Sequence, residues 1–186
     1  AALRILASVP RQPTLRIPLD DALGTVLAEP LVSPLDLPAW TNSAMDGYAT
    51  RSEDVRGASV ERPVRLRVVE VIPAGAFPAR ALQPGECARI FTGAPLPAGA
   101  DGVIRQEDTD LGRDTVEIQS DRDAGVNLRL AGEDIRRGVT VLEAGTELGA
   151  AELGVLASLA AAHPLVFRRP RVGILGGGDE IVDVDQ

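Results

Sequence analysis

Residues 64–68 read Val-Arg-Leu-Arg-Val, so that apolar and basic side chains alternate strictly along this stretch. A period of two is typical of a strand with one buried face. Short runs of similar character follow downstream, and Gly/Pro turns separate them; these runs are residues 87–91, 102–106 and 115–119. Because the turn signals recur about every 8–12 residues, the region from Ser59 to Gly145 is predicted to be an all-β module.

The sequence on either side of this module favours helices and isolated strands. Residues 14–19 are predicted to form a short strand, and Asp20 is a candidate N-cap for a helix through Ala28 that buries Leu23, Val26 and Leu27. A second helix is predicted over 150–162, with Glu152 bonding back to Gly149 and with Leu153, Leu156, Leu159 and Ala160 as its apolar stripe. Residues 2–9 resemble the end of an amphipathic helix.

The last residues indicate the beginning of a further domain. Residues 171–175 are predicted to form a strand that leads into Gly176-Gly-Gly-Asp-Glu180, and a strand followed by a glycine loop normally opens a parallel βα unit. We therefore predict a β-rich α+β fold in which an all-β module is inserted in a small α/β unit, followed by the first strand of a truncated parallel α/β domain. The expected boundaries are a helix over 1–13, a linker unit from 14–40 and 136–169, the β-rich module over 41–135, and the truncated domain over 170–186.

Charge and composition narrow the classes of partner. The net charge is −8 and the pI is about 4.7, which argues against non-specific binding to DNA, RNA or an anionic membrane surface. No stretch approaches the roughly 20 apolar residues that span a bilayer, and no signal peptide is visible. We therefore expect a cytoplasmic protein that binds neither nucleic acid nor membrane. A small anionic ligand remains compatible with this charge.

The scarcity of some residue types excludes several kinds of site. Cys87 is the only cysteine and His163 the only histidine, so a Cys/His zinc site is excluded and a serine or cysteine triad is disfavoured. All 19 basic residues are arginine, which removes lysine Schiff-base chemistry.

The rarest side chains lie together in Trp40-Thr-Asn-Ser-Ala-Met-Asp-Gly-Tyr48, which contains the only tryptophan, methionine and tyrosine of the chain. The stretch has neither a helical nor a strand period, so it is predicted to be a loop. Loops of this composition often carry function on a rigid scaffold. The alternative is a surface turn whose aromatic rings fill a gap in the hydrophobic core, and composition leaves both interpretations open.

Four loops place a carboxylate or hydroxyl beside glycine: residues 42–48, 91–95, 132–134 and 176–180. Glycine lets backbone N–H groups approach a ligand closely, and successive N–H donors suit phosphate. Nearby carboxylates suit a Mg²⁺ ion that bridges to phosphate oxygens. Together the loops indicate a metal-assisted site for a phosphorylated small molecule, although each motif is also a common turn former.

The order of these loops resembles one family. Ser33-Pro-Leu-Asp-Leu-Pro38 leads into Asn42-Ser-Ala-Met-Asp-Gly-Tyr-Ala49, and further blocks follow in order at 89–95, 100–107, 132–135 and 178–181. The series resembles the N-terminal half of the molybdopterin molybdenumtransferase family, which includes the bacterial MoeA type and the E domain of gephyrin. The resemblance covers essentially the whole chain, and residues 42–49 are its most specific part.

This resemblance implies an enzyme of the last step of molybdenum cofactor synthesis. Members of the family insert molybdate into adenylylated molybdopterin in a Mg²⁺-dependent reaction that hydrolyses the adenylate bond and releases AMP. They are homodimers whose active cleft lies between the molybdopterin-binding domain of one subunit and the β-rich domain of the other. We therefore expect a homodimer with a pterin substrate, possible hand-over of that substrate from a molybdopterin adenylyltransferase, a dimerisation role for the linker unit, and a molybdopterin-binding domain that begins at 170–186 and contacts the helix at 1–13.

The resemblance also assigns the site residues. It implies catalytic roles for Asp46, Thr92, Asp134 and Glu180; cofactor contacts through Thr92, Gly93, Gly177 and Gly178; and metal binding by Asp46, Asp179 and Glu180. Ionised carboxylates could coordinate Mg²⁺ or orient an attacking water or molybdate oxygen. A hydroxyl such as that of Thr92 could donate to a phosphate or pterin oxygen. Asn42 and Ser43 are expected to shape their loop through side-chain to backbone hydrogen bonds.

Two departures from the family pattern affect these expectations. Gly176 and Gly177 replace a Ser-Thr pair in the last block, which removes two hydroxyl donors. The family's large molybdopterin-binding domain and C-terminal β domain are almost wholly absent, so we expect that the 186 residues alone do not turn over.

Two other functions remain open at this point. A non-catalytic dimerisation or scaffold module, as in a gephyrin-like protein, would not need the carboxylate of Asp46. A generic β module that precedes a nucleotide-binding sheet would bind nucleotide independently of Asp46.

Overall fold

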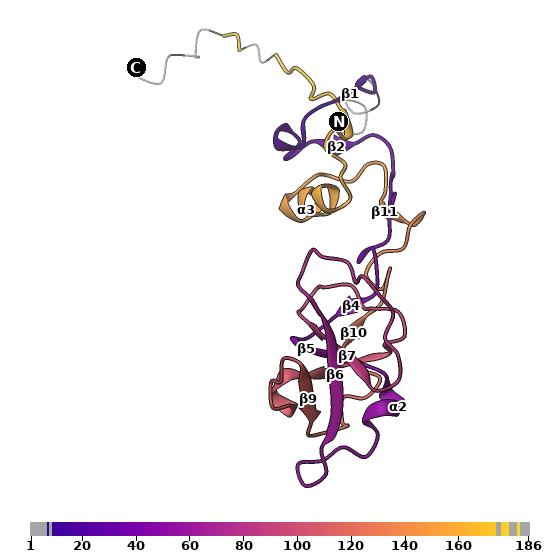
Figure 1. Cartoon of the computed structure of the whole chain (residues 1–186). Coiled ribbons are helices and arrows are strands. Elements are labelled where there is room, and N and C mark those ends of the chain that lie inside the picture. The colour runs from indigo at the N-terminus through magenta and orange to yellow at the C-terminus, as the bar shows by residue number, and fades with distance from the viewer. Residues whose placement is uncertain (1–6, 8, 174–175, 179–181, 183–186) are drawn as a thin grey trace. The chain divides into compact units, whose positions relative to one another are not determined.

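The computed structural model describes residues 7, 9–173, 176–178 and 182, and in it the chain forms two units (Figure 1). The terminal unit consists of Ala1–Val32 and Thr140–Gln186, and the central unit is Ser33–Val139. The central unit extends to Ser33 and Val139 because its two ends are joined there: the Ser33 amide donates to the Val139 carbonyl at 2.9 Å, and Leu37 forms a β-bridge with Ile135.

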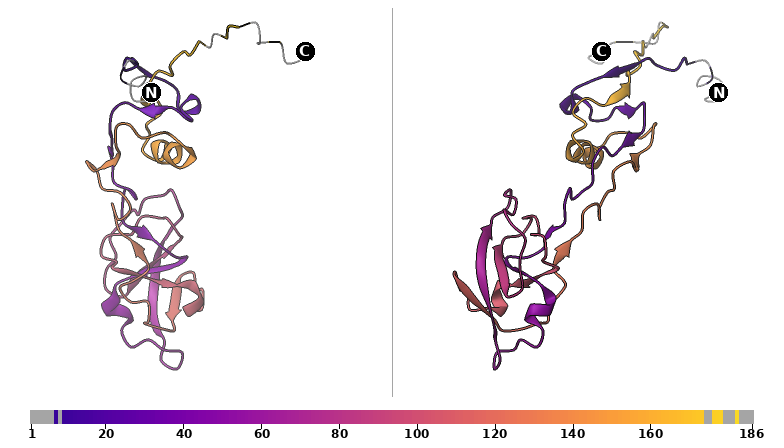
Figure 2. Two further views of the ribbon diagram at one scale, coloured as in Figure 1. Left: turned by 180° about the vertical axis from the view of Figure 1, so that it is seen from behind. Right: turned by 45° about the vertical axis from the view of Figure 1, so that its right-hand side comes forward.

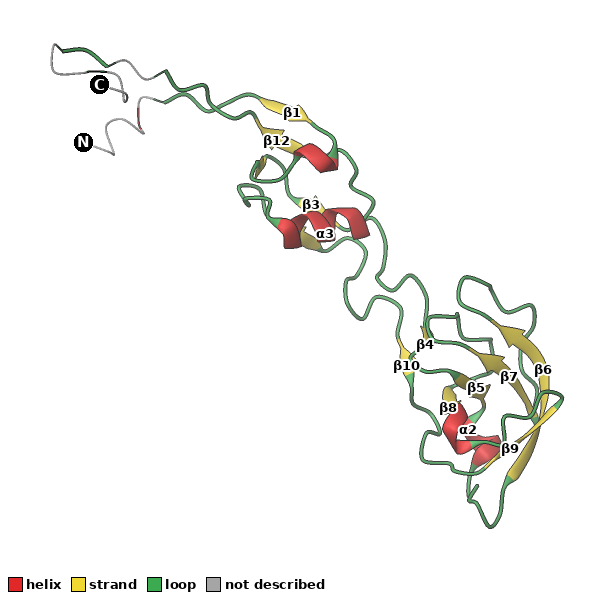
Figure 3. Cartoon of the chain, turned by 90° about the vertical axis from the view of Figure 1, so that its left-hand side faces the viewer, coloured by secondary structure: helices red, strands yellow, loops and turns green. Residues whose placement is uncertain are grey.

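A five-stranded sheet forms the body of the central unit (Figure 3), in the order β8-β5-β7-β6-β9. Its strands are β5 (Gly47–Thr50), β6 (Val64–Ile72), β7 (Glu86–Ile90), β8 (Gly102–Arg105) and β9 (Thr115–Ile118). Strands β6 and β7 run parallel, and the other neighbouring pairs are antiparallel. The strands predicted from residues 64–68, 87–91, 102–106 and 115–119 are therefore confirmed, with β6 four residues longer than the alternating run.

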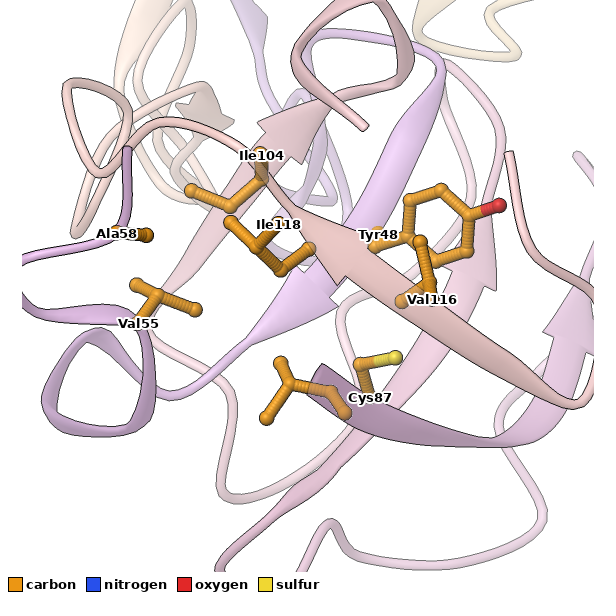
Figure 4. Close-up of a cluster of buried hydrophobic side chains, with 8 residues drawn as sticks. Tyr48, Val55, Ala58, Cys87, Ile104, Val116 and Ile118 are labelled. Atoms are coloured by element: carbon orange, nitrogen blue, oxygen red, sulfur yellow. The ribbon is translucent and has the colours of Figure 1, made fainter. Parts of the chain in front are cut away.

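Side chains are buried on both faces of this sheet. One face carries a cluster in which Tyr48, Leu66, Cys87 and Ile104 pack with Val55 of the short helix α2 (Ser52–Val55) (Figure 4). The other face carries a second cluster, composed of Ala49, Ile72, Leu82, Ala88, Ile90, Ala94 and Val103. Each fully buried Leu or Ile contributes on the order of 1.5–3 kcal/mol. The central strands β5 and β7 are thus packed on both faces. Asp46 directly precedes β5, and Thr92 follows the end of β7.

The stretch 42–48 is not a pure loop, and the sequence-based prediction is wrong in this respect. Asn42 and Ser43 form β4, which pairs with β10 (Leu128–Arg129), and Gly47 and Tyr48 begin β5. Two- and four-residue strands are too short to produce a readable period, because their pairing partners rather than their own side chains define them. The 3₁₀ turn η2 (Gln106–Asp108) follows β8.

The terminal unit is a small antiparallel α+β assembly (Figure 2). Its three-stranded sheet has the order β1-β12-β2, and β3 pairs with β11 beside the helix α3. The bounds of these elements are β1 (Thr14–Arg16), β2 (Val26–Leu27), β3 (Leu31–Val32), β11 (Thr140–Leu142), α3 (Ala150–Ser158) and β12 (Leu165–Phe167). Leu27, Leu148, Leu156 and Val166 form the core of this unit. The β-rich α+β class predicted from the sequence is confirmed.

The predicted helix over 20–28 is wrong. Only the 3₁₀ turn η1 (Leu19–Asp21) is present, and Gly24 then adopts a φ of 67°, which ends any helical run. Val26 and Leu27 instead form β2, paired with Val166 and Phe167 of β12. The apolar spacing of Leu23, Val26 and Leu27 imitated a helical face, but tertiary pairing with a distant strand decided the structure.

Helix α3 confirms the second predicted helix but ends earlier, at Ser158 rather than at residue 162. Glu152 bonds back to the Gly149 amide at 3.0 Å, as the sequence predicted. Leu156 and Leu159 are buried, whereas Ala160 is exposed and adopts a φ of 57°. This left-handed residue terminates the helix, so Ala160 does not belong to the apolar stripe.

The strand predicted over 171–175 and the helix predicted within 1–13 lie partly outside the described residues. Residues 171–173 form no strand, and residues 174–175 lie outside the described part of the chain. Of the helix expected within 1–13, residues 1–6 and 8 lie outside it as well. None of the helices in the described ranges has the length and apolar character needed to cross a bilayer.

Candidate functional site

Asp46 and Thr92 are adjacent in the central unit, although 46 positions separate them in sequence. Asp46 lies between β4 and β5, and Thr92 lies just beyond the end of β7. The backbone N–H and the hydroxyl of Thr92 both donate to Asp46 Oδ1, each at 2.8 Å. The structure therefore brings together two of the residues that the sequence predicted for the site.

This arrangement favours the ionised form of Asp46. The two hydrogen bonds from Thr92 lower the pKa of the Asp46 carboxyl, and the positive charge of Arg89 lowers it further, while partial burial acts in the opposite direction. Thr92 is a neutral partner, so the carboxylate keeps its full negative charge. Its second oxygen, Oδ2, accepts no hydrogen bond from the described residues and is available to a ligand.

The turn that carries Asp46 is built from local bonds. The Ser43 hydroxyl donates to the Met45 carbonyl at 2.5 Å and accepts from the Met45 amide at 3.2 Å. The Asn42 side chain donates to the Trp40 carbonyl at 3.4 Å. The predicted loop-shaping role of Asn42 and Ser43 is thus confirmed, because their polar side chains bond to backbone groups within two residues.

Gly47 is required by the close approach of β8. A Cβ atom at this position would lie 2.0 Å from the carbonyl oxygen of Ile104, a distance that no side chain tolerates. On the other side of the turn, the Gln106 amide donates to the Asp46 carbonyl at 3.0 Å. The glycine after the aspartate therefore allows β5 to pair with β8 directly behind the Asp46 carboxylate.

The three rare side chains near Asp46 have different environments. Tyr48 is 1% exposed and belongs to the core of the sheet, so the interpretation of an aromatic ring that fills a hydrophobic gap holds for this residue. Trp40 and Met45 are 41% and 38% exposed. The Trp40 ring packs edge-on against Phe77, with centroids 4.8 Å apart. Of these three side chains, only Trp40 and Met45 have substantially exposed apolar surface.

Gly93 shapes the second loop but offers no free amide. Its φ of 83° makes the tight turn after Thr92, and its N–H donates to the Ser43 carbonyl at 2.8 Å. The neighbouring Ala94 amide donates to Phe91. For these amides to bind a phosphate, their hydrogen bonds to the Ser43 and Phe91 carbonyls would first have to break. Direct contact between Gly93 and a cofactor therefore stays a prediction, and the backbone nest expected at this loop is already filled.

Asp134 lies in a third loop, where an arginine that the sequence analysis did not single out fixes it. Arg129 Nη2 donates to Asp134 Oδ2 at 2.5 Å, and Arg129 Nε donates to Glu133 Oε1 at 2.7 Å. These contacts raise the pKa of the Arg129 guanidinium, chiefly through the hydrogen bond to Glu133. An arginine four residues before a glutamate and five before an aspartate is the signal that could have identified it.

Strand β4 connects these loops within the central unit. Asn42 pairs with Arg129 of β10 and forms a β-bridge with Pro95, and the Ser43 amide donates to the Ala94 carbonyl. The segments that carry Asp46, Thr92 and Arg129 therefore share one backbone network. In the described part of the chain, the side chains of Asp134 and Asp46 share no hydrogen-bond partner.

The fourth predicted loop, residues 176–180, is only partly described by the structure. Asp179 and Glu180 lie outside the described residues, so their predicted catalytic and metal-binding roles have no structural description here. Gly177 and Gly178 are described, and Gly178 has a φ of 137°. Both belong to the terminal unit, and their contact with a cofactor stays a prediction.

Among the described residues, no three His, Cys, Asp or Glu side chains gather closely enough to enclose a metal ion. Mg²⁺ does not need such a cage, because it commonly takes one or two protein carboxylates and completes its shell with substrate phosphates and water. A single ionised carboxylate with a free oxygen, as at Asp46, meets that requirement. The donor set therefore fits Mg²⁺ but would not hold a structural zinc ion.

Comparison with known proteins identifies one family that this chain matches. The profile of the family described as MoeA N-terminal region (domain I and II) matches residues 1–160. Among curated proteins, the molybdopterin molybdenumtransferase of Nostoc sp. is 47% identical over 176 residues, which cover 95% of this chain and 40% of that protein. Molybdopterin molybdenumtransferase 2 of Mycobacterium tuberculosis is 45% identical over 165 residues, which cover 89% and 41%.

Solved structures show the same relationship. The crystal structure of the molybdopterin biosynthesis moeA protein from Pyrococcus horikoshii OT3 matches with a TM-score of 0.80 and 34% sequence identity. The match covers 85% of this chain and 42% of that one. The chain thus spans about two fifths of the length of the relatives that it matches.

Proposed function

This chain belongs to the family of MoeA N-terminal regions (domains I and II), and from that premise we propose that it forms part of a molybdopterin molybdenumtransferase. In this proposal the complete enzyme inserts molybdate into adenylylated molybdopterin and releases AMP. The carrying observation is the fixed and ionised carboxylate of Asp46, held by two donors from Thr92 and open at its second oxygen.

Asp46 and Thr92 have distinct roles in the proposed site. Asp46 supplies a negative charge in a defined position, which suits contact with a cation or a proton at the reacting group. Thr92 acts through Asp46, because its hydroxyl and amide both point at Oδ1 and restrict the carboxylate to one orientation. The paired strands β5 and β7, which lead into and out of these two loops, keep the geometry without rearrangement. A preorganised geometry is the condition for efficient electrostatic catalysis.

Mg²⁺ is the metal proposed for this site, with Asp46 Oδ2 as its ligand from the central unit. When bound, it would neutralise charge on the phosphate groups of the substrate. The residues of the fourth loop, Asp179 and Glu180, are proposed as further ligands. Asp134, fixed by Arg129, is proposed as a second carboxylate that faces the substrate.

The assembly and location of the complete enzyme are also proposals. A homodimer is proposed on the strength of the family resemblance described above. A pterin substrate received from a molybdopterin adenylyltransferase and a cytoplasmic location accompany the proposed reaction. Light scattering on the purified chain would test whether the contacts of the homodimer are present within these 186 residues.

A fusion enzyme tests the proposed activity. The chain is joined to the remaining part of the Nostoc relative, and AMP release from adenylylated molybdopterin is measured with Mg²⁺ and molybdate. We expect turnover in the fusion and a loss of at least about a hundredfold in Asp46→Asn, the scale typical of removing one catalytic group. Asp114→Asn is the matched control, since Asp114 is exposed and its carboxylate has no hydrogen bond within the described residues.

The outcomes separate the competing functions. Full activity in Asp46→Asn would reject the catalytic role and favour a dimerisation or scaffold module. A folded, dimeric fusion that releases no AMP would contradict the proposal outright, with the unmodified Nostoc protein as positive control. Nucleotide binding that survives Asp46→Asn unchanged would favour a generic β module.

A further inference from the structure

A cavity of about 370 Å³ opens on the central sheet, on the face that carries Tyr48 and its cross-strand neighbour Arg89. Its volume falls within the range of small-molecule sites. Gln106 and Arg113 provide further polar groups, while Val71 and Leu111 provide apolar wall. It is a separate feature from the Asp46–Thr92 pair, whose side chains do not line it.

The cavity is cationic. Arg89 and Arg113 both line it, and neither forms an ion pair with a carboxylate in the described part of the chain. Other arginines of this unit are paired, as Arg105 is with Asp123 and Arg129 with Asp134. No carboxylate among the described residues lines the cavity, so the charge of these two guanidinium groups is not compensated by the residues around it. Their natural complement is an anion.

Arg89 is fixed in place before any ligand binds. Its Nη1 donates to the Gly47 carbonyl at 3.0 Å, and its Nη2 donates to Gln106 Oε1 at 2.5 Å. The guanidinium carbon lies 5.1 Å from the centroid of the Tyr48 ring and 4.9 Å from that of Phe91. These contacts use two of the five N–H donors of a guanidinium, so donors remain for an oxyanion. Such a rigid fork loses little entropy on binding.

The apolar wall of the cavity includes a residue with an unfavourable backbone conformation, Leu111. Leu111 is 57% exposed and adopts a φ of 60°, a conformation that is unfavourable for a leucine. It is held there because its amide donates to Thr109 Oγ1 at 3.1 Å and the next amide, of Gly112, donates to Asp110 Oδ1 at 3.0 Å. Val71 on β6 is 59% exposed. An exposed apolar wall beside unpaired cations fits a ligand that has both an anionic and a flat apolar part.

We propose that this cavity binds a small organic oxyanion, with a phosphate-like group at Arg89 and Arg113 and a flat apolar group against Val71 and Leu111. The site adjoins the Asp46 turn, because Arg89 binds the carbonyl of Gly47 and the amide of Gln106 donates to Asp46. It is a binding site in its own right, and its existence does not depend on the proposed transferase activity.

Titration of the purified 186-residue chain tests this site. Phenyl phosphate, inorganic phosphate and phenol are added in parallel, and ¹H–¹⁵N chemical shifts are followed. We expect saturable shifts with phenyl phosphate at the amides of residues 47–48, 106 and 111–113. Inorganic phosphate is expected to bind at the same amides but at least threefold more weakly, and phenol is expected to produce no saturation. The difference between the first two distinguishes an organic phosphate from a free inorganic anion as the ligand.

Arg113→Gln is the informative variant, because Arg113 is exposed and its side chain has no hydrogen bond within the described residues, so the fold does not depend on it. We expect it to weaken phenyl phosphate at least about fivefold. Arg62→Gln removes the same charge from an exposed position that does not line the cavity, and it should leave the affinity unchanged. Equal weakening by both variants would show a non-specific charge effect and overturn the proposal.

A second variant tests the apolar wall independently. Val71→Glu introduces a negative charge at an exposed strand position, and we expect it to abolish saturable binding while the remaining spectrum stays that of a folded protein. Retained affinity in Val71→Glu, or shifts that do not map to the cavity in the unmodified chain, would contradict the proposal. Neither result would bear on the fusion-enzyme test, whose readout is AMP release and whose variant is Asp46→Asn.

Discussion

Asp46 and Asp134 lie on two loops of the same unit, and the structure holds their carboxylates in opposite ways. Asp46 directly precedes a central strand of a sheet that is buried on both faces, and its carboxylate receives two bonds from a neutral threonine. Asp134 lies on a loop outside that sheet, and its carboxylate is paired with Arg129. A neutral partner fixes a carboxylate and leaves its charge available, whereas a charged partner fixes it and compensates the charge. The comparison suggests why Asp46 suits a cation and Asp134 suits a positioned contact with substrate.

The largest effect should come from the glycines that form the two loops. Gly47→Ala places a Cβ atom 2.0 Å from the Ile104 carbonyl oxygen, so we expect a loss of about 3 kcal/mol in the free energy of unfolding. Gly132→Ala meets only side-chain atoms at 3.1 Å or more and pays for a φ of 70°, which costs about 1 kcal/mol. Urea denaturation measures both variants. Equal losses would show that the Asp46 loop is no more tightly built into the sheet than the Asp134 loop.

The next effect concerns the neutral bonds to Asp46. Thr92→Val keeps the backbone donor and removes the hydroxyl, so we expect a loss of about 1 kcal/mol, the scale of a typical hydrogen bond, because solvent weakens this bond at its exposed site. The same loss should be found in 50 mM and 500 mM NaCl, because the donor carries no net charge. Thr92→Ser retains the hydroxyl and is the control, which should unfold like the unmodified chain.

Arg129→Gln should have a smaller and salt-dependent effect. The Arg129, Glu133 and Asp134 side chains are 45%, 34% and 56% exposed, so solvent screens their attraction, and we expect a loss in low salt that is smaller than that of Thr92→Val. The loss should shrink in 500 mM NaCl. A loss that is larger than that of Thr92→Val and insensitive to salt would reverse the comparison between the two loops.

The smallest effect on the free energy of unfolding should be the one that depends on the ionisation of Asp46, and it should be visible at acidic pH. The folded pKa of Asp46 lies below its ordinary value of 3.8, because the Thr92 bonds favour the ionised form. Its stabilising contribution is therefore present above about pH 4 and is lost as the pH falls through the folded pKa. We expect the difference in unfolding free energy between the unmodified chain and Asp46→Asn to narrow from pH 6 to pH 2. A constant difference over this range would contradict the assignment.

The sequence predicted the central sheet better than the terminal unit, and the reason is physical. The run at 64–68 alternates over enough residues to define a strand, and β7, β8 and β9 lie between clear Gly/Pro turns. Strand β2 is only two residues long, and its apolar spacing matches a helical face. Its pairing with β12, nearly 140 residues away, leaves no trace in the local pattern.

The candidate site shows the same division. Asp46 and Thr92 could be predicted because the motifs around them are distinctive, but that Thr92 donates twice to one oxygen of Asp46 follows only from the pairing of β5 with β7. Arg89 was missed because a single arginine among 19 carries no signal by itself, whereas Arg129 had a local signal in the acidic residues four and five positions later. Gln106 and Tyr48, which contact Arg89, become its neighbours only once the strands are in register.

The most direct test of the account is the pKa of the Asp46 carboxyl, measured by ¹³C NMR titration in the unmodified chain and in Thr92→Val. The account predicts a value below the ordinary 3.8 in the unmodified chain and a higher value in Thr92→Val, with Thr92→Ser close to the unmodified chain. An ordinary pKa that is the same in all three proteins would contradict the claim that Thr92 holds Asp46 as a fixed, ionised group.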